Sequence, residues 1–257
     1  MNAIQVSHLS VAYEDNIVLR DINLKVPVGQ LVGIIGPNGA GKSTLIKAIL
    51  NQLPNKTGKV EILGHSFNPK NHLVGYVPQR NAVDWDFPTN ALDVVLMGRY
   101  AHIGIFNRPS AKDREKALKC LKSVGMGGFA DRSIGQLSGG QQQRVFLARA
   151  LAQEAEVYFM DEPFVGVDAA TELTIINILK KLKAKGKTVL VVHHDLQTVD
   201  EYFDWTVLLN KTIIASGPTK EIFTEEKLQQ TYGGKLFFMN KKNNENIAER
   251  GGLRDIR

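Results

Sequence analysis

Short, almost entirely apolar runs alternate along the chain with longer segments of helical periodicity. The apolar runs, each ending in turn-forming or polar residues, are 31-LVGIIG-36, 157-VYFMDEP-163 and 188-TVLVVHHD-195. Runs of this kind are typical of parallel strands that are buried on both faces of a sheet. The segments with a helical pattern are residues 42–53, 138–153 and 171–185. Strands that alternate with helices in this order predict an α/β layered core.

Other segments depart from this core pattern. An antiparallel β-subdomain flanking the core is predicted where polar and apolar residues alternate, in residues 4–13, 22–29 and 58–64. A helical subdomain of about residues 86–152, inserted between core strands, is predicted from two helical segments with no strand between them, 89–100 and 110–125. We expect a closing hairpin at 205–217, a main domain over 1–235 and a polar, loose C-terminal tail over 236–257.

Composition narrows the class of protein. With 257 residues, of which 43% are hydrophobic, the chain can bury the core of one large domain. The single cysteine, Cys120, excludes a disulfide framework and is expected to be a small buried hydrophobe in a reducing compartment. The N-terminus lacks the features of a signal peptide, and no apolar stretch approaches the roughly 20 residues of a membrane span. The formal charge of +6 is scattered, which argues against direct nucleic-acid binding.

The segment 36-GPNGAGKST-44, called the phosphate loop below, follows a predicted strand and precedes a predicted helix. Its glycines allow backbone N–H groups to surround phosphates at a helix N-terminus, whose dipole favours anions. In this context Lys42 is expected to reach the β- and γ-phosphates of a nucleotide and Ser43 to ligate Mg²⁺. The alternative is an ordinary glycine turn with an exposed lysine. The predicted nucleotide-binding residues are Gly36, Asn38, Gly39, Gly41, Lys42, Ser43 and Thr44.

Two acids end the predicted strand at 157–160, at the edge of the sheet where ligands of open α/β sheets bind. Successive side chains of a strand diverge, so Asp161 and Glu162 are expected to have different tasks. We assign Asp161 to the Mg²⁺ shell and Glu162 to polarising the attacking water as general base. Pro163 is expected to keep Glu162 extended. Without Lys42 upstream, an acidic turn after a core strand would be the better interpretation.

A second glycine-rich segment, 137-LSGGQQQR-144, identifies a family. A phosphate loop, this segment and a strand ending in Asp-Glu, in that order, resemble the ATP-binding cassette (ABC) ATPases of membrane transporters over about residues 1–235. The resemblance implies a P-loop NTPase core and two copies docked head to tail. It also implies that Ser138, Gly139, Gly140 and Gln141, called the signature turn below, close over the γ-phosphate held by the other copy.

The signature turn is also suited to this task by its physical chemistry. Ser138 is a good N-cap, and the two glycines leave backbone donors uncovered at the positive end of the helix. Two glycines in a first turn weaken a helix by roughly 1 kcal/mol each, which argues for a functional benefit. The alternative is merely a well-capped helix.

Four further roles are implied by the same resemblance. Tyr13 matches the aromatic residue that stacks on adenine, although it can equally be an ordinary strand aromatic. Gln79 matches the glutamine that senses Mg²⁺ and the attacking water and connects the site to the membrane partner. His194 matches the histidine that hydrogen-bonds the γ-phosphate, and Asp168 matches the aspartate of the loop that crosses the dimer interface. A metal site at His193 and His194 is rejected because neighbouring strand residues face opposite ways, so His193 is expected to pack in the core.

Three stretches resemble the ATPases of bacterial importers for manganese, zinc and iron: 78-PQRNAVDWDFP-88, 97-MGRY-100 and 162-EPFVGVDAATE-172. Manganese is the first choice, with zinc or an iron chelate as alternatives. The resemblance implies an integral permease and, indirectly, an extracytoplasmic metal-binding protein as partners, at the cytoplasmic face of the membrane. An exporter ATPase, a soluble cassette protein acting on nucleic acid or ribosomes, and a phosphate-loop kinase are the competing classes. Trp85 and Phe87 either form a docking surface or tuck into their loop.

Overall fold

The computed structural model describes most of the chain as far as Gly233. The described residues are 1–14, 16–54, 56–68, 72–85, 87–104 and 107–233. The predicted tail, 236–257, lies outside them. Among the helices of the described residues, none is long and apolar enough to cross a membrane.

A six-stranded sheet forms the centre of the molecule, with the strand order β10-β9-β3-β8-β7-β6. Its strands are β3 (Leu31–Ile35), β6 (Val74–Val77), β7 (Val157–Met160), β8 (Thr188–Val192), β9 (Trp205–Asn210) and β10 (Thr212–Pro218). All neighbours pair in parallel except β9 and β10, which form the predicted hairpin. Every residue of β3, β7 and β8 is buried, which confirms the three core strands predicted from their apolar runs. The short strand β6 was not predicted.

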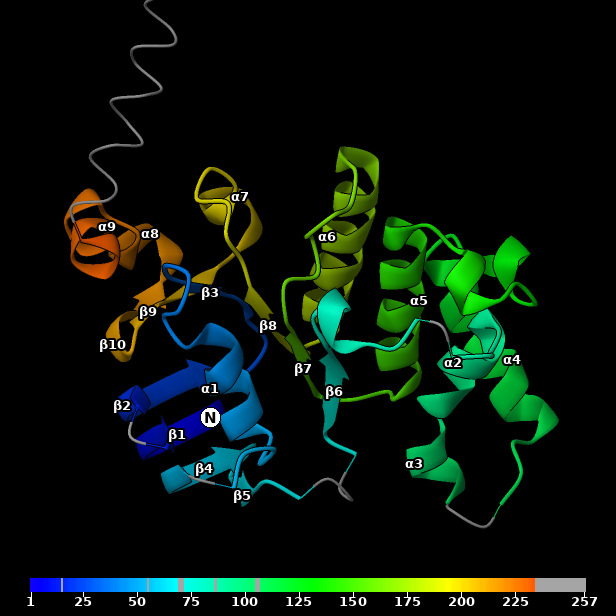
Figure 1. The fold of residues 1–257 in the computed structure, drawn as a ribbon, viewed down its shortest axis with the longest axis horizontal. Coiled ribbons are helices and arrows are strands. Elements are labelled where there is room, and N and C mark those ends of the chain that lie inside the picture. Colours follow the sequence, from blue (N-terminus) through cyan, green and yellow to red (C-terminus); the bar gives the residue numbers. More distant parts are fainter. Residues whose placement is uncertain (15, 55, 69–71, 86, 105–106, 234–257) are drawn as a thin grey trace, which may run out of the picture.

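A four-stranded antiparallel sheet, β2-β1-β4-β5, lies beside this core, as predicted. Its strands are β1 (Asn2–Tyr13), β2 (Asn16–Pro27), β4 (Lys56–Ile62) and β5 (His65–Ser66). Helix α1 (Lys42–Ile49) shares one hydrophobic core with this sheet and with one face of the central sheet (Figure 1). The helix ends four residues before the predicted residue 53, because Asn51 adopts a positive φ of 55°.

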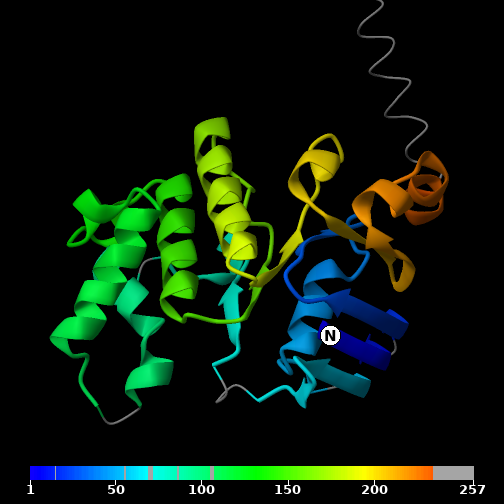
Figure 2. The same ribbon diagram turned by 180° about the vertical axis from the view of Figure 1, so that it is seen from behind.

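The other helices pack on the opposite face and at the far end of the central sheet. Figure 1 shows α2 (Ala91–Met97), α3 (Tyr100–Ile103), α4 (Ala111–Ser123) and α5 (Gly139–Ala152) grouped beyond β6. Helix α6 (Ala169–Ala184) stands between α5 and α7 (Val199–Tyr202) in both views (Figure 2). The independence of residues 86–152 as an inserted subdomain stays a prediction.

The remaining helical elements within the described residues are short. They are α8 (Thr219–Ile222), α9 (Glu225–Tyr232) and the 3₁₀ turns Arg80–Ala82, Gly127–Phe129 and Ile134–Gln136. Cys120 is half-buried in α4, where burial raises the pKa of its thiol. The thiol therefore stays protonated at neutral pH and packs as a small apolar group.

Candidate functional site

The phosphate loop connects β3 to α1 through glycines that the fold requires. A Cβ atom on Gly36 would lie 2.0 Å from the carbonyl oxygen of Leu209, and one on Gly41 would lie 2.5 Å from Cδ2 of Leu19. Gly39 and Gly41 have φ values of 79° and 93°, which side chains rarely tolerate. Gly41 is also the N-cap of α1, so the loop ends at the positive pole of that helix. The loop is thus built to present backbone N–H groups rather than side chains.

Lys42 opens helix α1 and is buried, with 6% of its surface exposed. Its Nζ atom donates to the carbonyl oxygens of Gly36, at 2.8 Å, and Pro37, at 2.9 Å. Burial lowers the pKa of Lys42, while the nearby carboxylates of Glu162 and Asp161 partly oppose this effect. The ammonium group therefore lies across the phosphate loop, where a bound polyphosphate would add negative charge beside this buried cation.

Asp161 follows β7 and contacts the phosphate loop directly. The Ser43 hydroxyl donates to Oδ1 of Asp161 at 2.8 Å, joining residues 118 positions apart. Asp161 is 1% exposed, and burial raises its pKa, while the hydrogen bond from Ser43 works against that rise. A hydroxyl and a carboxylate in contact are oxygen ligands of the type that Mg²⁺ prefers. The donor set therefore fits the predicted ion.

Glu162 occupies a different position from Asp161, as predicted, but its backbone differs from the prediction. Its φ is 55°, so Glu162 is left-handed and not extended as we expected from Pro163. This turn directs its carboxylate to two partners. Gln79 Nε2 donates to Oε2 at 2.7 Å, and His194 Nε2 lies 2.5 Å from Oε1.

These groups surround one pocket with a volume of about 610 Å³. It is lined by Asn38, Gly39, Ala40, Gly41, Lys42, Ser43, Thr44, Gln79, Glu162 and His194. Gly36 and Asp161 lie behind this lining, held by Lys42 and Ser43. The structure thus places an anion cradle, an oxygen donor pair and a carboxylate held by two side chains around the same space.

The other predicted site residues do not line this pocket. Tyr13 ends β1 with 47% of its surface exposed. The signature turn begins α5, where Ser138 is the predicted N-cap and forms a capping box with Gln141. Asp168 caps α6 by accepting hydrogen bonds from the backbone and side chain of Thr171, which hold the pKa of its carboxyl below the usual range. One copy of the chain therefore does not bring the signature turn to its own phosphate loop.

The loop after Gln79 contains a residue that the sequence analysis missed. The guanidinium of Arg80 donates to Oε1 of Gln142 at 3.1 Å, so it joins the segment next to Gln79 to the signature helix. Its backbone oxygen accepts from Nε1 of Trp85 at 2.9 Å, and the Trp85 ring packs edge-on to Phe146. Trp85 is therefore tucked in, whereas Phe87 is 55% exposed. The sequence feature that could have indicated this contact is the positively charged residue directly after Gln79.

His193 packs in the core, as predicted, and gives a test of stability against pH. It is 4% exposed, contacts the rings of Phe164 and Phe203, and lies 2.7 Å from the Thr198 hydroxyl. Burial lowers its pKa from 6.5 to about 4, with the charge of Asp195 acting in the opposite direction.

The unfolded chain therefore takes up a proton at His193 before the folded chain does, and stability is lost as the pH falls from about 6.5 to about 4. Between pH 7 and pH 5 we expect the free energy of unfolding to fall by about 2 kcal/mol more in this protein than in a His193→Gln variant. Urea unfolding at both pH values measures the difference. Equal losses in the two proteins would contradict the assignment.

Comparisons with known proteins agree with these features. A family model described as ABC transporter matches residues 19–165. The manganese transport system ATP-binding protein MntB of Bacillus subtilis (strain 168) is 59% identical over 242 residues, covering 94% of this chain and 97% of that protein. The zinc transport system ATP-binding protein TroB of Treponema pallidum (strain Nichols) is 56% identical over 234 residues, covering 91% and 88%.

Two solved structures have the same fold. A metal-chelate type ABC transporter in an inward-facing conformation matches with a TM-score of 0.79 and 30% identity, covering 90% of this chain and 89% of that one. A dimeric ATP-binding cassette in a post-hydrolysis state, bound to ADP and Pi, matches with a TM-score of 0.73 and 29% identity, covering 84% and 98%.

Proposed function

Because this chain belongs to the ABC transporter family and is an ATPase of that family, we propose that it drives the uptake of a divalent transition-metal ion. The carrying observation is the pocket lined by Lys42, Ser43 and Glu162, with Asp161 bonded to Ser43 behind this lining. ATP hydrolysis in this pocket would supply the free energy, and manganese is the first choice of ion.

The residues of the pocket divide the chemistry between them. The phosphate loop and Lys42 bind and orient the triphosphate, which brings the reacting atoms together at little further entropic cost. Ser43 and Asp161, with Gln79 beside them, would hold Mg²⁺, which when bound supplies positive charge at the β- and γ-phosphate oxygens. Glu162, held by Gln79 and His194, orients the attacking water and takes its proton.

The complete catalytic site requires a second copy. Ser138 is exposed at the positive end of α5, and within one chain the signature turn does not line the phosphate loop pocket. We propose that two copies dock head to tail, so that each signature turn contacts the γ-phosphate bound by the other. Only the closed pair makes this contact, so ATP favours closure and hydrolysis reverses it.

The partners are an integral permease and, through it, an extracytoplasmic metal-binding protein. The chain would lie at the cytoplasmic face of the membrane as a peripheral subunit. Exposed Phe87, eight residues after Gln79, supports a contact with the permease near the site. The ion would be selected by the permease and the metal-binding protein, because the described pocket is built for phosphates.

The choice of metal rests on the relatives. MntB is named for manganese transport and TroB for zinc transport, at similar identities to this chain. The manganese assignment is supported by the manganese name, which recurs among the similar relatives, and zinc is the second candidate.

The experiment is metal uptake by cells that carry this chain or its Glu162→Gln variant. We expect uptake of radioactive manganese to require the unchanged chain and to be inhibited only weakly by excess zinc. Purification of the tagged chain from membranes should bring an integral protein with it. Copurification with ribosomes or DNA instead would overturn the transporter assignment, and uptake of zinc in place of manganese would overturn the choice of metal.

A further inference from the structure

The segment 97-MGRY-100 joins α2 to α3 and makes unusually close contacts with the signature helix α5. A Cβ atom on Gly98 would lie 2.2 Å from the carbonyl oxygen of Arg149, so only glycine allows the two backbones to approach. The residue that follows, Arg99, is 5% exposed. This segment is therefore fixed against α5 near the end opposite to the signature turn.

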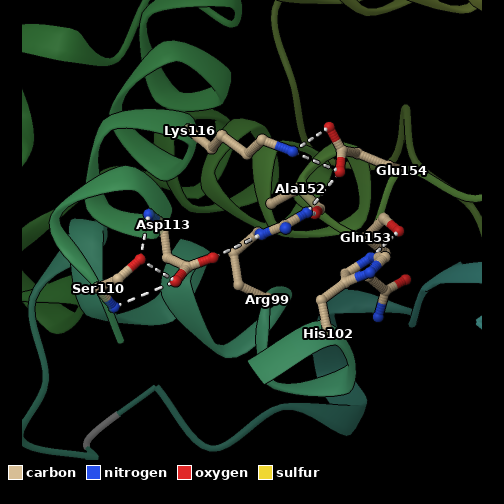
Figure 3. A network of polar contacts seen from close by, with 8 residues as sticks. All are labelled: Arg99, His102, Ser110, Asp113, Lys116, Ala152, Gln153 and Glu154. Carbon is tan, nitrogen blue, oxygen red and sulfur yellow. Dashed lines mark hydrogen bonds and ion pairs between the residues drawn. The ribbon is translucent and has the colours of Figure 1, made fainter. Parts of the chain in front are cut away.

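Arg99 contacts α4, the end of α5 and the loop that follows α5, as Figure 3 shows. Its Nη1 donates to the carbonyl oxygen of Ala152, the last residue of α5, at 2.9 Å. The same atom lies 2.7 Å from Oε2 of Glu154, while Nε lies 3.4 Å from Oδ1 of Asp113 in the first turn of α4. A guanidinium suits this position because it offers several donors in a fixed plane and matches the negative pole of a helix.

Other side chains reinforce the contacts of Arg99. Lys116 on α4 donates to both carboxylate oxygens of Glu154 at 2.9 Å. Hydrogen bonds from Lys116 and Arg99 hold the pKa of Glu154 below its usual range, so the acid is charged at neutral pH. Nε2 of His102 lies 2.9 Å from the carbonyl oxygen of Gln153. The C-terminal end of α5 is thus tied to α2, α3 and α4 at once.

We propose that Arg99 is a positioning residue for the signature turn. It fixes the C-terminal end of α5, and the rigid helix carries that orientation to Ser138 at its other end. This inference rests on the proposed function, because the signature turn must act on the nucleotide of a second copy. Arg99 is buried and does not line the phosphate loop pocket, so it would act through α5.

Arg99 holds one end of α5, so a small tilt of the helix there displaces the signature turn at the other end. Helix α5 has 14 residues, so at 1.5 Å per residue it is about 21 Å long. A tilt of about 3° at the fixed end moves the signature turn by about 1 Å, and such a misplacement can cost catalysis about a hundredfold. Because α5 also packs along its length against α2 and α4, loss of Arg99 alone is expected to have a smaller effect, about tenfold.

The test compares Arg99→Gln and Arg99→Lys with Lys119→Gln, a matched control. Lys119 also lies in this helical group but pairs with Glu115 on the exposed face of α4, with 72% of its side chain exposed. We expect Arg99→Gln to lower kcat for ATP hydrolysis about tenfold while the single chain binds ATP unchanged, with Arg99→Lys in between. The control should match the original protein. Circular dichroism and thermal unfolding select a temperature at which all variants are folded.

A double-mutant cycle separates positioning from a merely structural role. If Arg99 acts through the signature turn, Arg99→Gln should slow hydrolysis far less in a Ser138→Ala background than in the original chain. If Arg99→Gln and Ser138→Ala lowered kcat independently, so that their effects multiplied, the inference would be overturned. A loss of ATP affinity in the single Arg99→Gln chain would also overturn it. An unchanged kcat in the Ser138→Ala variant alone would contradict the proposed action of the signature turn on the nucleotide of a second copy. This outcome does not depend on Arg99.

Discussion

Replacing Glu162 by glutamine is expected to leave ATP binding intact and to slow hydrolysis about a thousandfold. The substitution keeps the size of the side chain and an oxygen that can accept from Gln79, now 2.7 Å away. It removes the carboxylate that would take a proton from the attacking water. Because ATP then persists between the two copies, the variant should accumulate as a closed dimer.

Single-turnover hydrolysis and size-exclusion chromatography with Mg·ATP measure the two effects of Glu162→Gln. Glu172→Gln is the matched control, since Glu172 lines the small neighbouring cavity with Glu162 but does not line the phosphate loop pocket. The control should hydrolyse ATP normally and dissociate after turnover. Normal turnover by Glu162→Gln would remove this residue from its assigned role.

The parts of the site that depend on local sequence could be predicted. Gly39 and Gly41 adopt positive φ values in the loop between a strand and a helix. The sequence on either side of them is enough to predict this loop. The contact of Ser43 with Asp161 spans 118 positions. It was nevertheless predictable, because both residues follow parallel core strands and such strands present their carboxyl ends at one edge of the sheet.

Features that depend on tertiary packing could not be predicted in the same way. Arg99 was noticed only as part of the stretch 97-MGRY-100, and its contacts need the start of α4 and the end of α5 to meet. The sequence does not show where the Trp85 side chain points, because this depends on its contacts with the ring of Phe146 and the backbone of Arg80. The left-handed turn at Glu162 overrides the preference of a residue before proline, because its carboxylate is held by partners from two other segments.

Substituting arginine for Ser138 is expected to abolish hydrolysis by the pair while a single chain binds ATP as before. The change removes the N-cap of α5, at a cost of about 1 kcal/mol, and places a long side chain where the phosphate of the second copy must approach. Thr224→Arg is the matched control, because Thr224 is an exposed N-cap of α9. The control should lose similar stability and keep its activity.

Mixing Ser138→Arg with a Lys42→Ala variant decides which copy the signature turn serves. Each variant alone has two defective sites. If the signature turn acts on the neighbour, a mixed pair has one site with both defects and one site with neither. Random pairing makes half of the pairs mixed, so about a quarter of the original activity should return. If each chain instead used its own signature turn, every site in a mixed pair would carry one defect and no activity would return.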